Sequence, residues 1–151
     1  MEEFSYEDVV QYAINQEIES AELYHDLADR TRDPRAKEIF KQLEEMEKEH
    51  RRTLENFDLQ AFAQHPEEEY VDFRLTDYMV EIPPTRELDF QQALILAAKR
   101  EDKTRQLYEN MANRMASFPK GRDLFLLLAK EEGRHKHIIE DLYDQIIHEK
   151  S

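Results

Sequence analysis

Two short motifs place side chains that can bind metal ions one helical turn apart. Glu47 and His50 lie in the stretch LEEMEKEH, and Glu132 and His135 lie in KEEGRHKH. Residues three apart share a helix face, and both motifs fall within stripes of apolar residues that a helix normally buries. Burying an unpaired carboxylate is costly in free energy, so a positive partner must neutralise these groups or they must be protonated.

Two further glutamates lie at the centre of apolar helix faces. On a helical wheel, Glu17 is surrounded by apolar residues of segment 10–28 and Glu101 by those of segment 94–112. The separation of Glu17 from Glu47 is almost the same as that of Glu101 from Glu132. If the chain turns back midway, both glutamates of a pair return to the same height, about 22 Å from the turn. All six groups would then meet in one layer.

Four carboxylates and two imidazoles in one layer form the ligand set of a di-metal site. A carboxylate can bridge two cations, each imidazole can bind one of them, and two divalent ions balance four carboxylates. An oxygen-rich set with one nitrogen for each metal suits iron or manganese better than zinc. The alternative is a metal-free buried polar network. The predicted ligands are Glu17, Glu47, His50, Glu101, Glu132 and His135.

Two tyrosines follow the lone glutamates at helical spacing. Tyr24 and Tyr108 each come seven residues after one of them, two turns along the same face. They are either ordinary core aromatics or donors of a hydrogen bond to a ligand carboxylate, where a phenol can also act as a local redox buffer.

Other polar residues are expected at the surface or edge of the fold. Glu22 and His25 form a third Glu-x-x-His, but Glu22 lies about 140° from Glu17 on the helical wheel, outside the apolar stripe. No lysine is central in the stripes. The arginines and histidines expected to face outward are Arg51, Arg105, His65, His137 and His148.

Apolar periodicity predicts four long helices, over about 5–31, 34–57, 89–117 and 119–148. Ser5 and Asp8 form a plausible capping box, and Asp33-Pro34 is a capping residue followed by proline at the first helical position. The joints between the first and second helices and between the third and fourth are short. Each pair is therefore expected to form an antiparallel hairpin.

A long crossover over 58–88 joins the two hairpins. Because a structureless loop of this length is unusual in a compact domain, a short amphipathic helix is expected within it. The apolar residues at helical spacing in this segment are Val71, Leu75, Tyr78, Met79 and Ile82. The whole chain, residues 1–151, is expected to form one all-α domain, a four-helix bundle of two hairpins.

The two hairpins repeat each other at a nearly constant offset. When Phe40 is aligned with Phe125, the second helix matches the fourth, and each Glu-x-x-His motif falls on the other. When Glu17 is aligned with Glu101, the first helix matches the third, and the two tyrosines also coincide. The match includes specific polar residues, so the chain contains an internal repeat of a helix pair.

The composition excludes several classes of protein. A net charge of −14 opposes nucleic-acid binding, which needs clustered Lys and Arg, and favours cations, although acidity alone also keeps proteins soluble. The absence of cysteine excludes disulfides, thiolate metal sites and iron–sulfur clusters. The acidic start MEEFSYED is unlike a secretory signal, and no apolar run approaches the ~18–20 residues of a membrane span. We expect a cytoplasmic protein without nucleic-acid or membrane partners.

Four segments resemble the di-iron signature of the ferritin-like superfamily, and most closely that of its rubrerythrin branch. They are AINQEIESAELYHDLA, LEEMEKEHRRTL, LAAKREDKTRQLYENMA and LAKEEGRHKHII, which together represent all four helices. The resemblance implies a ferritin-like fold and a non-haem centre of two iron ions that reduces hydrogen peroxide, with manganese or zinc as possible substitutes. The four glutamates would supply bridging and terminal carboxylates, and His50 and His135 would be the nitrogen ligands.

Two features depart from the rubrerythrin pattern. Rubrerythrins proper carry a rubredoxin module that holds iron on four cysteines, and this chain has none, so its electron donor must be a separate protein. They also carry an extra carboxylate one turn after the glutamate of the third helix, where this chain has Thr104. A symmetric six-ligand site remains. Because members of the branch commonly dimerise, sometimes by exchanging a hairpin, a homodimer is expected.

Three functions are compatible with this pattern. The first is an oxidoreductase that reduces hydrogen peroxide or dioxygen at the di-iron centre. The second is a ferroxidase that oxidises iron for storage in a multimeric shell. The third is a non-enzymatic module in which the metal ions only staple the bundle.

Overall fold

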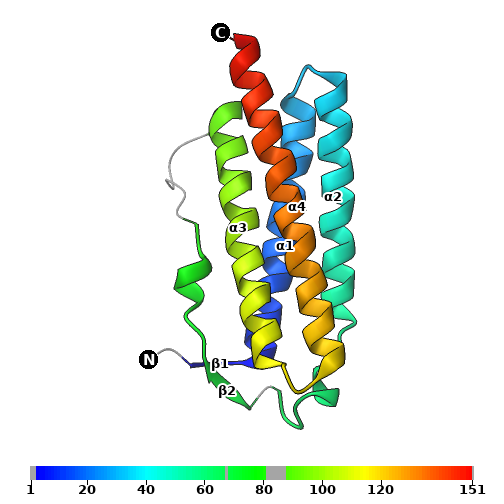
Figure 1. The fold of residues 1–151 in the computed structure, drawn as a ribbon, viewed down its shortest axis with the longest axis vertical. Coiled ribbons are helices and arrows are strands. Elements are labelled where there is room, and N and C mark those ends of the chain that lie inside the picture. The colour runs from blue at the N-terminus through cyan, green and yellow to red at the C-terminus, as the bar shows by residue number, and fades with distance from the viewer. Residues whose placement is uncertain (1–2, 67, 81–87, 151) are drawn as a thin grey trace.

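Four long helices run along a common axis in the computed structural model, which describes residues 3–66, 68–80 and 88–150 (Figure 1). They are α1 (Tyr6–Arg30), α2 (Pro34–Glu55), α3 (Phe90–Arg114) and α4 (Pro119–Lys150). Helix α1 packs mainly against α2, α3 mainly against α4, and α1 against α3 joins the two hairpins. The all-α bundle of two hairpins is confirmed.

Local capping interactions fix where the helices begin. The Ser5 hydroxyl accepts from the Asp8 backbone N–H at 3.0 Å, and the Asp8 carboxylate accepts from the Ser5 N–H, so the predicted capping box is present. The Asp33 carboxylate accepts from the Arg35 N–H at 3.0 Å, with Pro34 at the first helical position. Helix α3 begins with a second capping box, from Asp89.

The apolar core consists of two clusters that lie on either side of a polar layer. One cluster joins the start of α1 with Leu54 of α2, the second half of α3 and the start of α4. The other joins the end of α1 with the start of α2, the start of α3 and Ile139 of α4. On every helix the predicted ligands lie between these two stretches. The fold therefore holds them at mid-bundle, enclosed above and below by apolar side chains.

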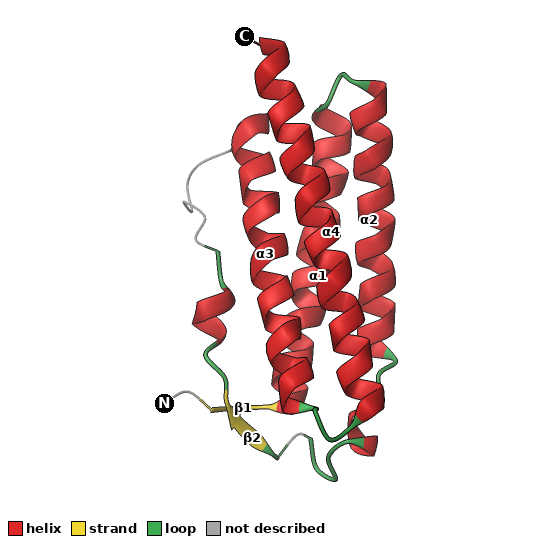
Figure 2. Ribbon diagram, viewed as in Figure 1, coloured by secondary structure: helices red, strands yellow, loops and turns green. Residues whose placement is uncertain are grey.

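The crossover differs in detail from the sequence-based expectation. Its short helix is a single 3-10 turn, η2 (Leu75–Tyr78), rather than an amphipathic α-helix that begins near Val71. A second 3-10 turn, η1 (Leu59–Ala61), follows α2. Residues Tyr70–Asp72 instead form strand β2, which pairs antiparallel with β1 (Glu3–Ser5) at one end of the bundle (Figure 2).

The strand pairing explains this difference. It supplies hydrogen-bond partners for the backbone just before α1 and leads into Phe73, which is only 1% exposed and lies beneath the Arg114 guanidinium. Anchoring a phenylalanine in the core outweighs the weak helical periodicity of the segment. Ile82, the last residue of the expected helix, lies outside the described residues.

None of the helices in the described ranges is both long and apolar enough to cross a membrane.

Candidate metal centre

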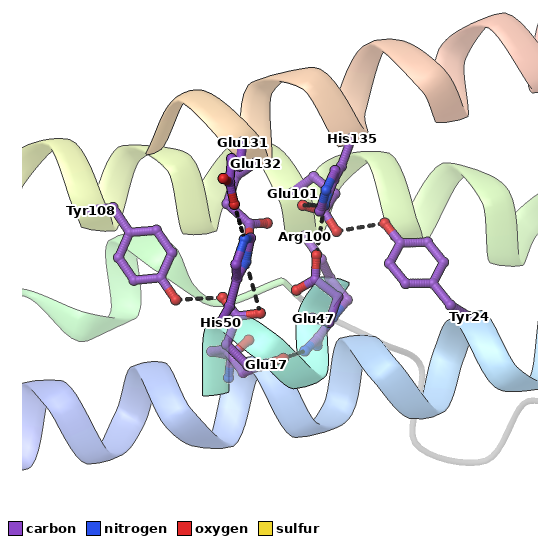
Figure 3. Close-up of polar contacts among 11 residues, drawn as sticks. Glu17, Tyr24, Glu47, His50, Arg100, Glu101, Tyr108, Glu131, Glu132 and His135 are labelled. Carbon is purple, nitrogen blue, oxygen red and sulfur yellow. Dashed lines mark hydrogen bonds and ion pairs between the residues drawn. The ribbon is translucent and has the colours of Figure 1, made fainter. Parts of the chain in front are cut away.

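Six ionisable side chains from all four helices meet in the polar layer at mid-bundle (Figure 3). None is more than 4% exposed. They form two overlapping groups of four, and within each group the ligand atoms all lie within 4.8 Å of one another. One group is Glu17, Glu47, His50 and Glu132, and the other is Glu47, Glu101, Glu132 and His135.

The two overlapping groups share Glu47 and Glu132. Each group then has one lone glutamate and one histidine of its own. The sequence repeat is thus reproduced in space as an approximate two-fold arrangement, in which the shared carboxylates occupy the middle.

The two histidines lie parallel across the bundle. Their ring centroids are 5.6 Å apart, with an angle of 8° between the ring planes. His50 Nδ1 lies 2.8 Å from Glu132 Oε1, and His135 Nδ1 lies 2.7 Å from Glu47 Oε1. Each imidazole therefore directs the same nitrogen, Nδ1, toward the shared carboxylate of the opposite motif.

The two buried tyrosines donate hydrogen bonds to the unshared glutamates. The Tyr24 hydroxyl of α1 donates to Glu101 Oε1 of α3 at 2.5 Å, and the Tyr108 hydroxyl of α3 donates to Glu17 of α1. Burial raises the pKa of both tyrosines well above the usual value, and the neighbouring carboxylates raise it further. Both hydroxyls therefore stay protonated at neutral pH. Of the two alternatives that the sequence left open for these tyrosines, the structure has the hydrogen bond to a glutamate carboxylate in both cases.

Burial and mutual repulsion shift the pKa values of three of the four carboxylates. Burial, followed by repulsion from Glu101, raises the pKa of Glu47 and of Glu132 well above the ordinary glutamate value. Burial also raises the pKa of Glu101, but the interactions with Glu132, His135 and Tyr24 outweigh it and leave that pKa lowered. Glu47 and Glu132 therefore bind protons more tightly than ordinary glutamates do. Binding a cation at this cluster would release such protons.

Some polar atoms of the cluster have no hydrogen-bond partner among the described residues. Glu17 Oε2 and Glu101 Oε2 are fully buried and accept no hydrogen bond there. A buried acceptor without a partner is costly in free energy. Glu17 and Glu101 each belong to one of the four-residue groups, so a cation within each group would supply the missing interaction. The observed donor set, oxygen-rich with one imidazole for each group, fits iron or manganese.

Two residues near the cluster were not identified from the sequence. Glu131 of α4 accepts a hydrogen bond from His50 Nε2. Arg100 of α3 is 8% exposed and donates to the Gln16 carbonyl and to the Glu19 carboxylate, both at 3.2 Å. Glu131 and Arg100 each come one residue before a glutamate of the apolar stripe. On a helical wheel they therefore lie about 100° away from that glutamate. The only available signal for Glu131 was its mismatch with Met46 in the internal repeat.

The charge of His50 reflects its two carboxylate neighbours. Burial lowers the pKa of His50, but the nearby carboxylates of Glu17 and Glu131 outweigh burial and raise it from 6.5 to about 9. In the metal-free protein His50 is therefore an imidazolium at neutral pH and partly balances the carboxylates.

A groove of about 300 Å³ between α1 and α2 leads toward the cluster. Its lining includes buried Glu17 together with the outer residues His25, Glu44 and Lys48. His25 Nδ1 lies 3.2 Å from Glu44, and Lys48 pairs with the same carboxylate at 2.9 Å. The groove reaches as far as Glu17, whose side chain remains fully buried.

The remaining sequence predictions concern surface residues. Glu22 and His25 are exposed, as expected, and neither belongs to the cluster. Arg51 pairs with Glu55 at 3.5 Å, and Arg105 pairs with Asp102 and Glu109, so both arginines face outward. His65 and His137 are exposed. The side chain of His148 lies outside the described part of the chain.

A four-helix bundle of two hairpins with a buried Glu/His cluster is typical of di-metal carboxylate proteins. The sequence matches the family model described as rubrerythrin over residues 4–74 and 92–151. The chain therefore belongs to the rubrerythrin family.

A solved structure of a hypothetical protein from Pyrococcus furiosus has a similar fold, with a TM-score of 0.72. It is 25% identical in sequence, and the match covers 96% of this chain and 92% of that one. No curated protein matches the sequence.

Proposed function

We propose that the six clustered residues bind two iron ions and that the protein is a di-iron oxidoreductase acting on hydrogen peroxide or dioxygen. The observation that carries this proposal is the pair of overlapping four-residue groups, each with one imidazole and three carboxylates. Two divalent ions would balance the four carboxylates and would bind the oxygens of Glu17 and Glu101 that accept no hydrogen bond among the described residues.

The arrangement suggests a role for each ligand. Glu47 and Glu132 belong to both groups and would bridge the two ions. Glu17 with His50 would complete one coordination shell, and the equivalent pair on the other side, Glu101 with His135, would complete the second. Bound iron supplies electrons and Lewis acidity toward an oxygen species.

The rest of the site orients the ligands and limits access to them. The tyrosine hydroxyls fix the unshared glutamates by hydrogen bonds and, being protonated, can also donate a proton or an electron locally. The two apolar clusters keep bulk water from the layer along the bundle axis. The groove beside Glu17 has room for a small neutral molecule such as hydrogen peroxide.

Reduction of peroxide or dioxygen consumes electrons that the chain must obtain elsewhere. With no cysteine it cannot hold a rubredoxin-type iron. We therefore propose that a separate protein donates the electrons. Because members of the rubrerythrin branch commonly dimerise, we also propose that the working assembly is a homodimer.

Metal analysis of protein purified without chelators, followed by anaerobic reduction and titration with hydrogen peroxide under optical spectroscopy, tests this function. We expect about two iron ions per chain and complete reoxidation by peroxide. The variant Glu132→Gln should lose both metal and reactivity. Its control is Glu140→Gln, which makes the same substitution at an exposed position of α4. A reduced, iron-loaded protein that is inert to peroxide and dioxygen would contradict the enzymatic role and favour a structural one. A large cage on size-exclusion chromatography would instead favour iron storage.

A further inference from the structure

The internal repeat breaks down at one position that contacts the cluster. In the alignment of α2 with α4, Glu47 matches Glu132, but the preceding residues are Met46 and Glu131. Glu131 offers a carboxylate, whereas the thioether of Met46 is only a weak acceptor. The two halves of the site therefore differ beside their histidines.

The hydrogen bonds of the two histidines show the consequence of this difference. Both direct Nδ1 into the cluster, toward Glu132 and Glu47 respectively. On the far side of the ring, His50 Nε2 donates to Glu131 of α4 (Figure 3). His135 Nε2 is fully buried and has no hydrogen-bond partner among the residues that the structure describes. One imidazole is thus held from both sides and the other from one side only.

We propose that Glu131 makes the two metal positions unequal, so that the ion beside His50 binds more tightly than the ion beside His135. This inference rests on the proposed di-metal function. Glu131 acts through His50, as a positioning residue, and need not touch a metal ion itself.

A carboxylate on the outer nitrogen strengthens a histidine ligand in two ways. By accepting the Nε2–H, it fixes the tautomer whose free lone pair is on Nδ1, the atom that faces the cluster. Its negative charge also makes the imidazole more basic, which strengthens the bond from Nδ1 to a cation. His135 lacks both effects, and its buried Nε2–H carries the cost of an unsatisfied donor. The chain should therefore load one position before the other.

Calorimetric titration of the metal-free protein with Co²⁺ tests the proposal. We expect two binding events of unequal affinity in the wild-type protein. Glu131→Gln keeps an acceptor but removes the charge, so it should weaken the tighter event by roughly tenfold and leave the weaker event unchanged. Glu140→Gln removes one charge from an exposed site on the same helix and should change neither event.

A second measurement reports on the histidines directly and does not depend on affinity. In the zinc-loaded protein, long-range ¹H–¹⁵N spectra should show a downfield Nε2–H for His50, and this signal should move in Glu131→Gln while that of His135 stays in place. It also verifies that the variant is folded, because both rings report from the core.

The outcomes separate the two proposals. Two Co²⁺ ions of equal affinity, or a Glu131→Gln variant that weakens both events equally or neither, would overturn the inequality and leave the di-metal centre intact. A wild-type protein that binds no Co²⁺ would overturn the proposed function and this inference together.

Discussion

The stability of the metal-free protein should fall as pH rises, and His50 should account for much of this dependence. Burial lowers the pKa of His50, but Glu17 and Glu131 outweigh it, so the pKa is about 9 in the folded protein against 6.5 without those contacts. Because the pKa of His50 is higher in the folded than in the unfolded protein, protonation of His50 stabilises the fold. This stabilisation is fully present below about pH 6.5 and is lost as pH rises through 9. At about 1.4 kcal/mol for each pKa unit, the full loss is about 3.5 kcal/mol, and most of it falls between pH 6.5 and pH 9.

Two glutamates act in the same direction. Burial and repulsion from Glu101 raise the pKa of Glu47 and Glu132, so their contribution is present near pH 4.5 and is lost as pH rises above it. All three groups therefore predict a metal-free protein that weakens toward alkaline pH. Loading with metal should flatten this dependence, because bound cations replace the protons.

The contribution of His50 to stability is measured by urea unfolding in the presence of a chelator. Unfolding is monitored by circular dichroism at pH 6.5 and at pH 9. His50→Gln removes the titrating ring and should reduce the fall in unfolding free energy between these pH values by about 3 kcal/mol. His137→Gln, which removes an exposed histidine of α4, is the control. If His50→Gln keeps the full wild-type pH dependence, the account of the His50 charge is refuted.

Three further variants test the ligands, their support and the crossover. Glu47→Gln changes a residue of both four-residue groups and should leave the protein almost free of metal, whereas Glu17→Gln should retain about one ion; equal metal contents would contradict the assignment of Glu47 as shared. Tyr108→Phe, which deletes the hydroxyl bonded to Glu17, should lower the unfolding free energy by about 1.5–3 kcal/mol in urea, and an unchanged midpoint would contradict that bond. Phe73→Ala should lower the free energy of unfolding in urea by about 3–5 kcal/mol. A much smaller loss would show that Phe73 does not anchor the crossover.

The six clustered residues could be predicted because their positions follow from helical geometry alone. Glu17 and Glu47 are equally far from a short turn, so antiparallel packing must bring them to one height. The internal repeat then doubled the signal, since it placed a second glutamate pair and a second histidine at matching positions. The tyrosines followed from the same spacing, although the sequence alone did not decide between packing and hydrogen bonding.

The individual residue pairs that form between the two hairpins could not be predicted in this way. The bond from His50 of α2 to Glu131 of α4 depends on how the two hairpins are rotated against each other, which helical periodicity does not specify. The pairing of Glu3–Ser5 with Tyr70–Asp72 involves three-residue strands. Strands this short are below the length at which alternation is recognisable, so the weak helical spacing of the crossover was the stronger signal.

The most direct test of the di-metal centre is anomalous diffraction from crystals of the iron-loaded protein, recorded at the iron absorption edge. Two anomalous peaks should lie within the polar layer, one beside Nδ1 of His50 and the other beside Nδ1 of His135, with Glu47 and Glu132 between them. No peak in this layer, or iron found only at acidic positions on the surface, would contradict the account.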